Sequence, residues 1–502
     1  MVIINILIRT VSFSYDVLLS KLVGAEGIGL FQMAVSVLML PLIITTAGIP
    51  TAVSRLVAEQ SSQNNRNNVK SIFIAAVSFT LVLSAALSML LLASAPYISS
   101  EIFKNHDMLY CIYFLCPAIV IISMTSVLRG YYYGLKRIGT ASISEIIEHV
   151  SRFFIILLFL YSIYPVKPLY GAVISVCGIS IGEAFDLIWL IFIQRRSVRR
   201  LTYTRTSPLK PAALLVKLFS IAAPLTMSGL FTAILQFVNA ILIPARLAAS
   251  GYSSSEAVIA FGRIMGMAMP LIYLPYVFTS ALVINIIPDI ARQLALKNHK
   301  ALQNNILLSI KITLLIAIPL SAIYLFFPEQ LAYLLYSDPK TAPYIAGMGY
   351  STIFLAVQHT FSGILNGLGY SARSMLHRLA GMFMQLVLTF FLAGNPQFGV
   401  NGYFLSFFLS TLIVCLLDIP VLLKAIRPKI NYSDLFLKPF TAVAFMLALI
   451  YASPIFFDRL DLADKTAFIF RFIISGLAYI LILDITEAIP HKLLSKLLSI
   501  NK

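Results

Sequence analysis

The segment LFQMAVSVLMLPLIITTAGIPTAVS (residues 30–54) decides the fold, because it contains no charged side chain from end to end. A transmembrane α-helix needs about 20 consecutive apolar residues, and this segment exceeds that length. Runs of the same kind recur along the chain before and after it. We therefore predict an all-α polytopic membrane protein.

The composition agrees with this prediction. Apolar residues make up 59% of the 502 residues and charged residues only 11%, and the mean hydropathy is +0.91. Soluble domains carry roughly a quarter charged residues, so a soluble enzyme, a fibrous or disordered chain and a nucleic-acid-binding protein are excluded. The formal net charge of +17 has another explanation in a polytopic chain. Lys and Arg gather in cytoplasmic loops and near anionic lipid headgroups.

The apolar runs predict about fourteen transmembrane helices. They cover residues 2–22, 30–54, 71–95, 108–128, 143–163, 169–193, 214–245, 258–287, 304–327, 343–365, 379–394, 398–422, 437–456 and 468–489. The first residues, MVIINILIRT, have no basic region before the apolar run, so we interpret them as the first span rather than as a cleavable signal peptide. Pro270 and Pro275 lie inside a span. Such breaks are tolerated in membranes where neighbouring groups satisfy the freed backbone, and in transporters they lie near the substrate path. An ordinary kink is the alternative.

The basic residues predict the orientation. Of the 37 Lys and Arg residues, 25 lie in or beside the segments that follow even-numbered spans or in the C-terminal tail, and 7 lie in or beside those that follow odd-numbered spans. Cytoplasmic loops carry the excess of Lys and Arg. We therefore expect a multi-pass protein of the cytoplasmic membrane with both termini in the cytoplasm.

Two short matches at one spacing indicate an internal duplication. Ile49-Pro50 recurs 238 residues later as Ile287-Pro288, and Leu128-Arg129-Gly130 recurs 237 residues later as Leu365-Asn366-Gly367. Repeats relate the halves of many transporters. We predict two six-helix lobes over 1–193 and 214–422, a basic cytoplasmic linker over 194–213, and a terminal helix pair with a cytoplasmic tail over 423–502. A phosphate-binding tail is the alternative for the basic segment.

The sequence lacks the motifs of covalent chemistry. It has no G-x-x-x-x-G-K-[ST] phosphate loop and no H-E-x-x-H pattern, and its four Cys and six His show no metal-ligand spacing. The external loops are too short for a folded catalytic domain. We expect a transporter rather than an enzyme, without a cofactor or a metal site. The sequence leaves the coupling ion open between Na⁺ and H⁺.

Charged residues inside the predicted spans mark the candidate site. A charge at a helix centre costs roughly 2.5–3.5 kcal/mol, so it faces protein or water. We expect three cations to line a cavity for an anionic headgroup, because Arg binds phosphate bidentately; they are Arg9, Arg152 and Arg263. The candidate acidic coupling residues are Asp16, Glu148 and Glu183.

Two alternatives remain for these charges. Glu148 and Arg152 are four residues apart, so they can form an ion pair within one helix. Arg263 can extend to the membrane interface from a helix end. Glu183 and Asp186 share one helix face, three residues apart.

Three segments of the chain resemble one known family. They are GAEGIGLFQMAVSVLMLPLIITTAGIPTAVSRLVAE (24–59), LRGYYYGLKRIGTASISEIIEHVSRF (128–153) and GRIMGMAMPLIYLP (262–275). They are similar to the stage V sporulation protein B group, in the polysaccharide-exporter branch of the multidrug/oligosaccharidyl-lipid/polysaccharide superfamily. The resemblance extends over nearly the whole chain. It implies fourteen helices in two six-helix lobes plus a terminal pair.

The resemblance also implies a function. It implies a flippase that moves an undecaprenyl-pyrophosphate-linked saccharide, a peptidoglycan precursor for the spore cortex, by alternating access. In the lipid II flippases of the superfamily an Arg at the opening of the corresponding helix lines a cationic cavity, and Arg263 occupies the matching place. The implied partners are the lipid-linked saccharide, membrane lipids and cell-wall synthesis enzymes.

Three other functions stay open at this point. A cation-coupled multidrug antiporter would use unpaired carboxylates in place of the Arg residues. A membrane glycosyltransferase or polymerase would form product from a lipid-linked donor. A scaffold for the sporulation machinery would transport nothing.

Overall fold

The computed structural model describes residues 2–63, 65–198, 211–426, 432–452, 464–486 and 488, and the regular elements among them are all helices. Twelve of the described segments are long and apolar enough to cross a membrane. The prediction of an all-α polytopic membrane protein is therefore confirmed.

The twelve segments depart from the predicted spans at four places. The predicted spans 2–22 and 30–54 are joined into one element, and the predicted span 258–287 is divided into two. The predicted spans 143–163 and 343–365 form helices that are not among the twelve. The first of these carries three charged residues within eight positions, and the second is broken near Tyr350 into two shorter helices. Both departures have a local cause in the sequence.

The joined element is α1 (Val2–Thr46), which bends at Gly24. This residue has a φ of 78°, a left-handed conformation that costs glycine little because it has no Cβ. The chain therefore passes from the first predicted span to the second without a loop. After a short break at Gly48 it continues as α2 (Ile49–Ser62).

The chain forms two compact units, which we call unit 1 and unit 2. Unit 1 comprises Met1–Gly266 and Thr389–Val400, and unit 2 comprises Met267–Leu388 and Asn401–Lys502. The boundary at Gly266 lies inside the predicted span 258–287, so the compact units are not divided as the predicted lobes 1–193 and 214–422 are. Most of the predicted linker, 199–210, lies outside the described residues. The lobes stay a prediction about the sequence repeat.

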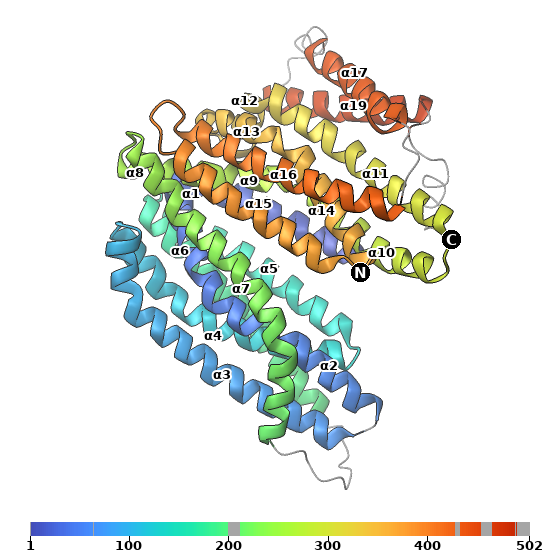
Figure 1. Cartoon of the computed structure of the whole chain (residues 1–502). Coiled ribbons are helices and arrows are strands. Elements are labelled where there is room, and N and C mark those ends of the chain that lie inside the picture. Colours follow the sequence, from blue (N-terminus) through green and yellow to red (C-terminus); the bar gives the residue numbers. More distant parts are fainter. Residues whose placement is uncertain are drawn as a thin grey trace. The chain divides into compact units, whose positions relative to one another are not determined.

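Unit 1 is a bundle in which α1 packs against helices from both predicted lobes (Figure 1, blue to green). Its further helices are α3 (Arg66–Tyr97), α4 (Asp107–Gly134), α5 (Ile138–Ser162), α6 (Pro168–Val198), α7 (Pro211–Ala249) and α8 (Ser254–Gly262). Helix α1 contacts α4, α6, α7 and α8. A buried apolar core that includes Val53, Tyr132 and Leu218 joins α2, α4 and α7.

Unit 2 contains shorter helices and two apolar cores. Its helices are α9 (Met269–Ile272), α10 (Pro275–Ala295), α11 (His299–Phe326), α12 (Pro328–Leu331), α13 (Ala342–Gly349), α14 (Ser351–Gly367), most of α15 (Ser371–Leu392), α16 (Val400–Ile426), α17 (Lys438–Ala452) and α19 (Asp464–Ile485). One core joins α10, α11, α14 and α16, and the other joins α11 to α17 and α19.

The internal repeat coincides with a repeated helix contact. In unit 1 a Cβ added to Gly130 of α4 would lie 2.5 Å from the carbonyl oxygen of Pro50 in α2. In unit 2 a Cβ added to Gly367 of α14 would lie 3.2 Å from the carbonyl oxygen of Ile287 in α10. The same two sequence matches therefore bring the same pair of segments into close backbone contact in each unit.

The divided span is a broken helix. After α8 the chain forms a π-helical turn at Arg263–Ala268, then α9, and it breaks again before Pro275. Two backbone carbonyls at the break, both within unit 2, accept hydrogen bonds from tyrosine hydroxyls: Tyr324 donates to Leu271 at 2.7 Å and Tyr336 donates to Met267 at 2.7 Å. Neighbouring side chains thus satisfy the backbone at the break, as a membrane requires.

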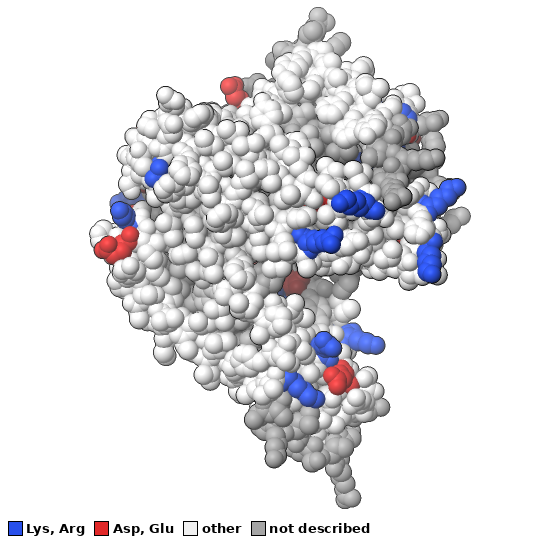
Figure 2. All heavy atoms as spheres, in the orientation of Figure 1, with Lys and Arg blue, Asp and Glu red and all other residues white. Residues whose placement is uncertain are grey.

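The outer surface suits a lipid environment. Large apolar side chains are exposed along the helices, for example Val82 and Met89 of α3, at 70% and 71%. Figure 2 shows that most of the visible face carries no charge. Charged side chains are therefore informative where they are buried instead.

Candidate functional site

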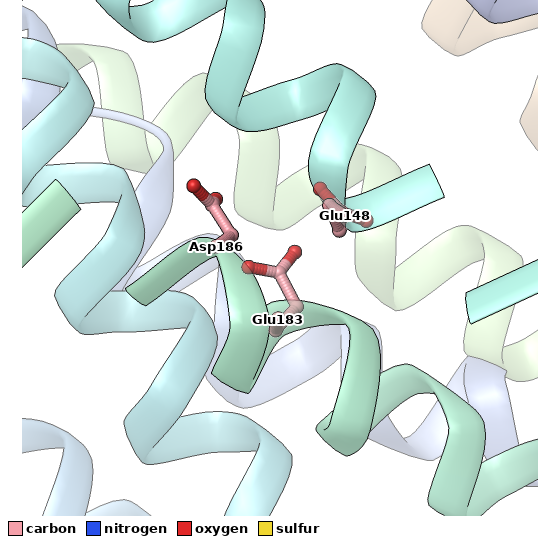
Figure 3. A group of neighbouring side chains, drawn as sticks. All are labelled: Glu148, Glu183 and Asp186. Atoms are coloured by element: carbon pink, nitrogen blue, oxygen red, sulfur yellow. The ribbon is translucent and has the colours of Figure 1, made fainter. Parts of the chain in front are cut away.

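The candidate site is a cluster of charged side chains buried inside unit 1, between α4, α5 and α6. Glu148 comes from α5, and Glu183 and Asp186 come from α6 (Figure 3). Their carboxylate oxygens lie within 4.8 Å of one another. The three residues are 5%, 5% and 0% exposed. Like charges at this spacing are unfavourable unless cations are interposed.

Arg129 of α4 connects two of the carboxylates. Its Nη2 donates to Oε2 of Glu148 at 2.7 Å and also to Oδ2 of Asp186. Arg129 is largely buried, with 17% of its side chain exposed. One guanidinium thus fastens α4 to both α5 and α6.

Arg152 provides the second cation. Its Nη2 donates to Oε1 of Glu148 at 2.5 Å, one helical turn away. The absence of a side chain at Gly182 leaves room for Arg152 against α6, since an added Cβ there would lie 3.0 Å from the Arg152 Cβ. The charge of Arg152 also acts on Asp16 of α1, so a fourth helix adjoins the cluster.

Glu183 lies in this cluster without a guanidinium of its own. Among the described residues its hydrogen bond comes from the Thr125 hydroxyl of α4, at 2.8 Å. With every group ionised, three carboxylates and two guanidiniums leave one negative charge in excess. We call these five charged residues the buried charge network.

Helical spacing assembles the network. Thr125 and Arg129 are four apart on α4, Glu148 and Arg152 are four apart on α5, and Glu183 and Asp186 are three apart on α6, so each pair shares one face. Asp107 in the first turn suits the start of α4, and α6 begins with Pro168 at its first position. The three faces meet because α4, α5 and α6 pack against one another.

The structure brings together some of the predicted site residues and not others. Glu148, Glu183 and Arg152 meet in the network, and Asp16 adjoins it. The ion pair between Glu148 and Arg152, one of the two alternatives, is formed. Arg263 is partly exposed at the start of the π-helical turn, outside the network. Arg9 is in α1, but its side chain lies outside the described residues.

Sequence reasoning missed Arg129. The predicted span ended at Leu128, which assigned Arg129 to a loop, whereas α4 continues to Gly134. The internal repeat is a signal that Arg129 lies within its helix. The matching residue of the second half, Asn366, lies inside α14. The sequence predicts that Asp186 shares a helix face with Glu183, but it does not mark Asp186 as a site residue.

The network suits ion handling rather than bond-breaking chemistry. Buried carboxylates need compensating cations, and two guanidiniums supply them here. The excess of one negative charge is too small for a divalent ion, whose sites gather several oxygen ligands. Buried ionisable residues inside a membrane helix bundle mark ion or substrate pathways.

Comparisons with known proteins agree with the fold. Residues 1–292 match the family described as polysaccharide biosynthesis protein, and residues 220–391 match the family described as MatE. Stage V sporulation protein B of Bacillus subtilis (strain 168) is 25% identical over 429 residues, which are 85% of this chain and 83% of that protein. The predicted resemblance is confirmed.

Two solved structures are similar in fold. Lipid II flippase MurJ in an inward closed conformation has a TM-score of 0.70 and 16% identity, over 96% of this chain and 98% of that one. An inward-facing multidrug resistance MATE family transporter of the MOP superfamily has a TM-score of 0.68 and 14% identity, over 86% of this chain and 100% of that one. The likeness to these two structures shows the fold of the chain.

Proposed function

Because the chain belongs to the polysaccharide biosynthesis protein family, we propose that it is a flippase that moves an undecaprenyl-pyrophosphate-linked saccharide across the cytoplasmic membrane by alternating access. The observation that carries this proposal is the family match over residues 1–292. The whole-chain likeness to a lipid II flippase fold supports it. We further propose a peptidoglycan precursor for the spore cortex as the cargo, cell-wall synthesis enzymes as partners, and both termini in the cytoplasm.

The physical task of such a protein fits a polytopic helical chain. A saccharide pyrophosphate cannot cross hydrocarbon unaided, because its charges would lose their hydration. A polar path through the protein removes that cost while the prenyl tail stays in lipid. Outward movement of negative charge is also favoured by the membrane potential, at about 2.3 kcal/mol per charge per 100 mV.

Arg263 is our candidate for contact with the pyrophosphate. It is partly exposed and begins the π-helical turn of a broken membrane helix, and π-turns and broken helices recur at functional sites. Nη2 of Arg152 is bonded to Glu148 within the network. Arg9 stays a candidate on its sequence position alone.

We expect Arg263→Ala to slow flipping of the lipid-linked saccharide about tenfold or more, because a charge-assisted contact to phosphate is lost. Arg263→Lys should recover part of the rate. Arg292→Ala is the matched control, since Arg292 is an exposed guanidinium on α10. Flipping rates in proteoliposomes give the measurement. An Arg263→Ala rate equal to that of Arg292→Ala would remove Arg263 from the cargo site.

A second candidate function, cation-coupled drug antiport, is favoured by the MatE match over residues 220–391. The two functions differ in the cargo they select. We would offer proteoliposomes a labelled lipid-linked saccharide and, separately, a labelled organic cation. The flippase proposal predicts that only the first is moved and that unlabelled saccharide lipid competes with it. Transport of the organic cation alone would establish the antiporter instead.

A further inference from the structure

We propose that the buried charge network binds one exchangeable proton per molecule, at the carboxyl group of Glu183. The binding itself does not depend on the proposed function. The role of the proton, which is to drive the flippase cycle through α4, α5 and α6, rests on that function. The proposal depends on a charge count, an unpartnered acceptor and the surroundings of Glu183.

Within the five residues of the buried charge network, three carboxylates and two guanidiniums call for one monovalent cation. Arg129 neutralises one carboxylate and Arg152 another, through ion pairs with Glu148 and Asp186. Glu183, which is 5% exposed, is left with a hydroxyl donor and no ion pair of its own among the described residues. A buried carboxylate without a countercharge is costly, and a bound proton removes that cost.

An unpartnered acceptor indicates where the proton would be shared. Oδ1 of Asp186 is buried and has no hydrogen-bond partner, although Asp186 is 0% exposed. The Ser144 hydroxyl of α5 adjoins Asp186, but its one proton is donated to the carbonyl of Ala141 at 2.8 Å. A buried hydrogen-bond acceptor without a donor lowers the stability of the fold. A protonated Glu183, whose carboxylate lies within 4.8 Å of that of Asp186, supplies the missing donor.

The same geometry disfavours a metal ion as the occupant. Hard cations gather six or more oxygen ligands. In the network Arg129 already takes one oxygen of Glu148 and one of Asp186, and Arg152 takes the other oxygen of Glu148. Few free oxygens are left around Glu183. A proton needs only one acceptor and one neighbour to receive its hydrogen bond.

The groups around Glu183 come from every helix that packs on α6. Helix α4 contributes Arg129 and Thr125, α5 contributes Glu148 and Arg152, and α6 contributes Asp186. One step further out, His149 of α5 adjoins Glu148, and Tyr15 and Asp16 of α1 adjoin Arg152. The carboxylates of Glu148 and Asp186 favour the protonated form of Glu183, and the two guanidiniums favour the ionised form. Their balance makes the proton exchangeable.

Release of the proton would change the ion pairs that join α4, α5 and α6. An ionised Glu183 competes with Glu148 and Asp186 for Arg129 and Arg152. Arg129 links α4 to both α5 and α6. A change in its ion-pair partners therefore changes the contacts of all three helices. Proton binding and helix rearrangement are therefore coupled in one network.

Infrared difference spectroscopy on the purified full chain tests the binding without any cargo. We expect the carbonyl stretch of a protonated carboxyl group at a pH at which exposed Asp and Glu side chains are ionised, and Glu183→Gln to lack this band. Glu145→Gln is the control, because Glu145 lies on the neighbouring helix α5 and accepts from the Tyr133 hydroxyl at 3.1 Å, outside the network; it should keep the band. A band that survives in Glu183→Gln overturns the proposal. So does a spectrum that responds to Na⁺ at constant pH and not to acid.

Proteoliposomes with an imposed pH gradient test the role in transport. We expect the gradient to accelerate flipping by the unchanged protein several-fold, and Glu183→Gln to lose that acceleration while Glu145→Gln retains it. Gradient-driven flipping that is equal in the three proteins overturns the role of the proton. If the infrared band depends on Glu183 but no cargo is flipped at any pH, the proposed function fails and the proton site stands.

Discussion

Arg129→Ala should destabilise the protein by about 3–5 kcal/mol, because it leaves two buried carboxylates without their countercharge. Glu148 and Asp186 both accept a hydrogen bond from Nη2 of Arg129, and both are almost completely buried. The effect is measured by thermal unfolding in detergent, with intrinsic fluorescence as the signal. The only tryptophan of the chain, Trp189, lies on α6 three residues after Asp186, so it reports on this region.

Two further variants make that result specific. Arg55→Ala removes an exposed guanidinium from α2 in the same unit and should leave the unfolding temperature nearly unchanged. Arg129→Ala combined with Asp186→Asn should regain part of the loss, because one of the stranded charges is gone. An Arg129→Ala protein as stable as Arg55→Ala would show that the network contributes nothing to the fold.

Gly262→Ala should destabilise unit 1 by about 1–3 kcal/mol or more, because the added methyl group has no space. A Cβ on Gly262 of α8 would lie 1.9 Å from the carbonyl oxygen of Ala25 in α1. The obstacle is backbone, which cannot turn aside as a side chain can. The same fluorescence-detected unfolding measures the effect.

Gly139→Ala is the matched control and should change stability with the opposite sign. Gly139 lies near the start of α5, and a Cβ there would meet nothing within 4 Å. Alanine in a helix is favoured over glycine by about 0.5–1 kcal/mol. Equal stability of the two variants would mean that α1 and α8 do not approach as closely as described.

Much of the fold follows from residues that can be recognised in the sequence. The uncharged runs predict the helices, and Pro270 and Pro275 predict the interruption of the span 258–287. The bend at Gly24 and the length of α1 could not be predicted, because they depend on a backbone conformation that many glycines never adopt. The boundary between units at Gly266 depends on packing of α7 and α8 against α1, which has no signature along the chain.

Part of the site could be predicted from the sequence, because a buried charge is costly. The cost of a buried charge points to Glu148, Arg152 and Glu183 one at a time. It does not identify their common partner, since Arg129 is at the end of a span where an Arg usually extends to water. The bond from Arg129 to Asp186 exists only once α4 and α6 pack against each other. The spacing of residues within one helix therefore cannot predict which charged side chains pair between helices.

The most direct test of the account is whether the purified chain moves a pyrophosphate-linked saccharide across a bilayer. A fluorescent lipid-linked saccharide is placed in both leaflets of vesicles, and a membrane-impermeant quencher is added outside. The account predicts that protein-containing vesicles lose nearly all their fluorescence, whereas protein-free vesicles lose only the signal of the outer leaflet. Loss confined to the outer leaflet in both kinds of vesicle, with folded protein present, would contradict it.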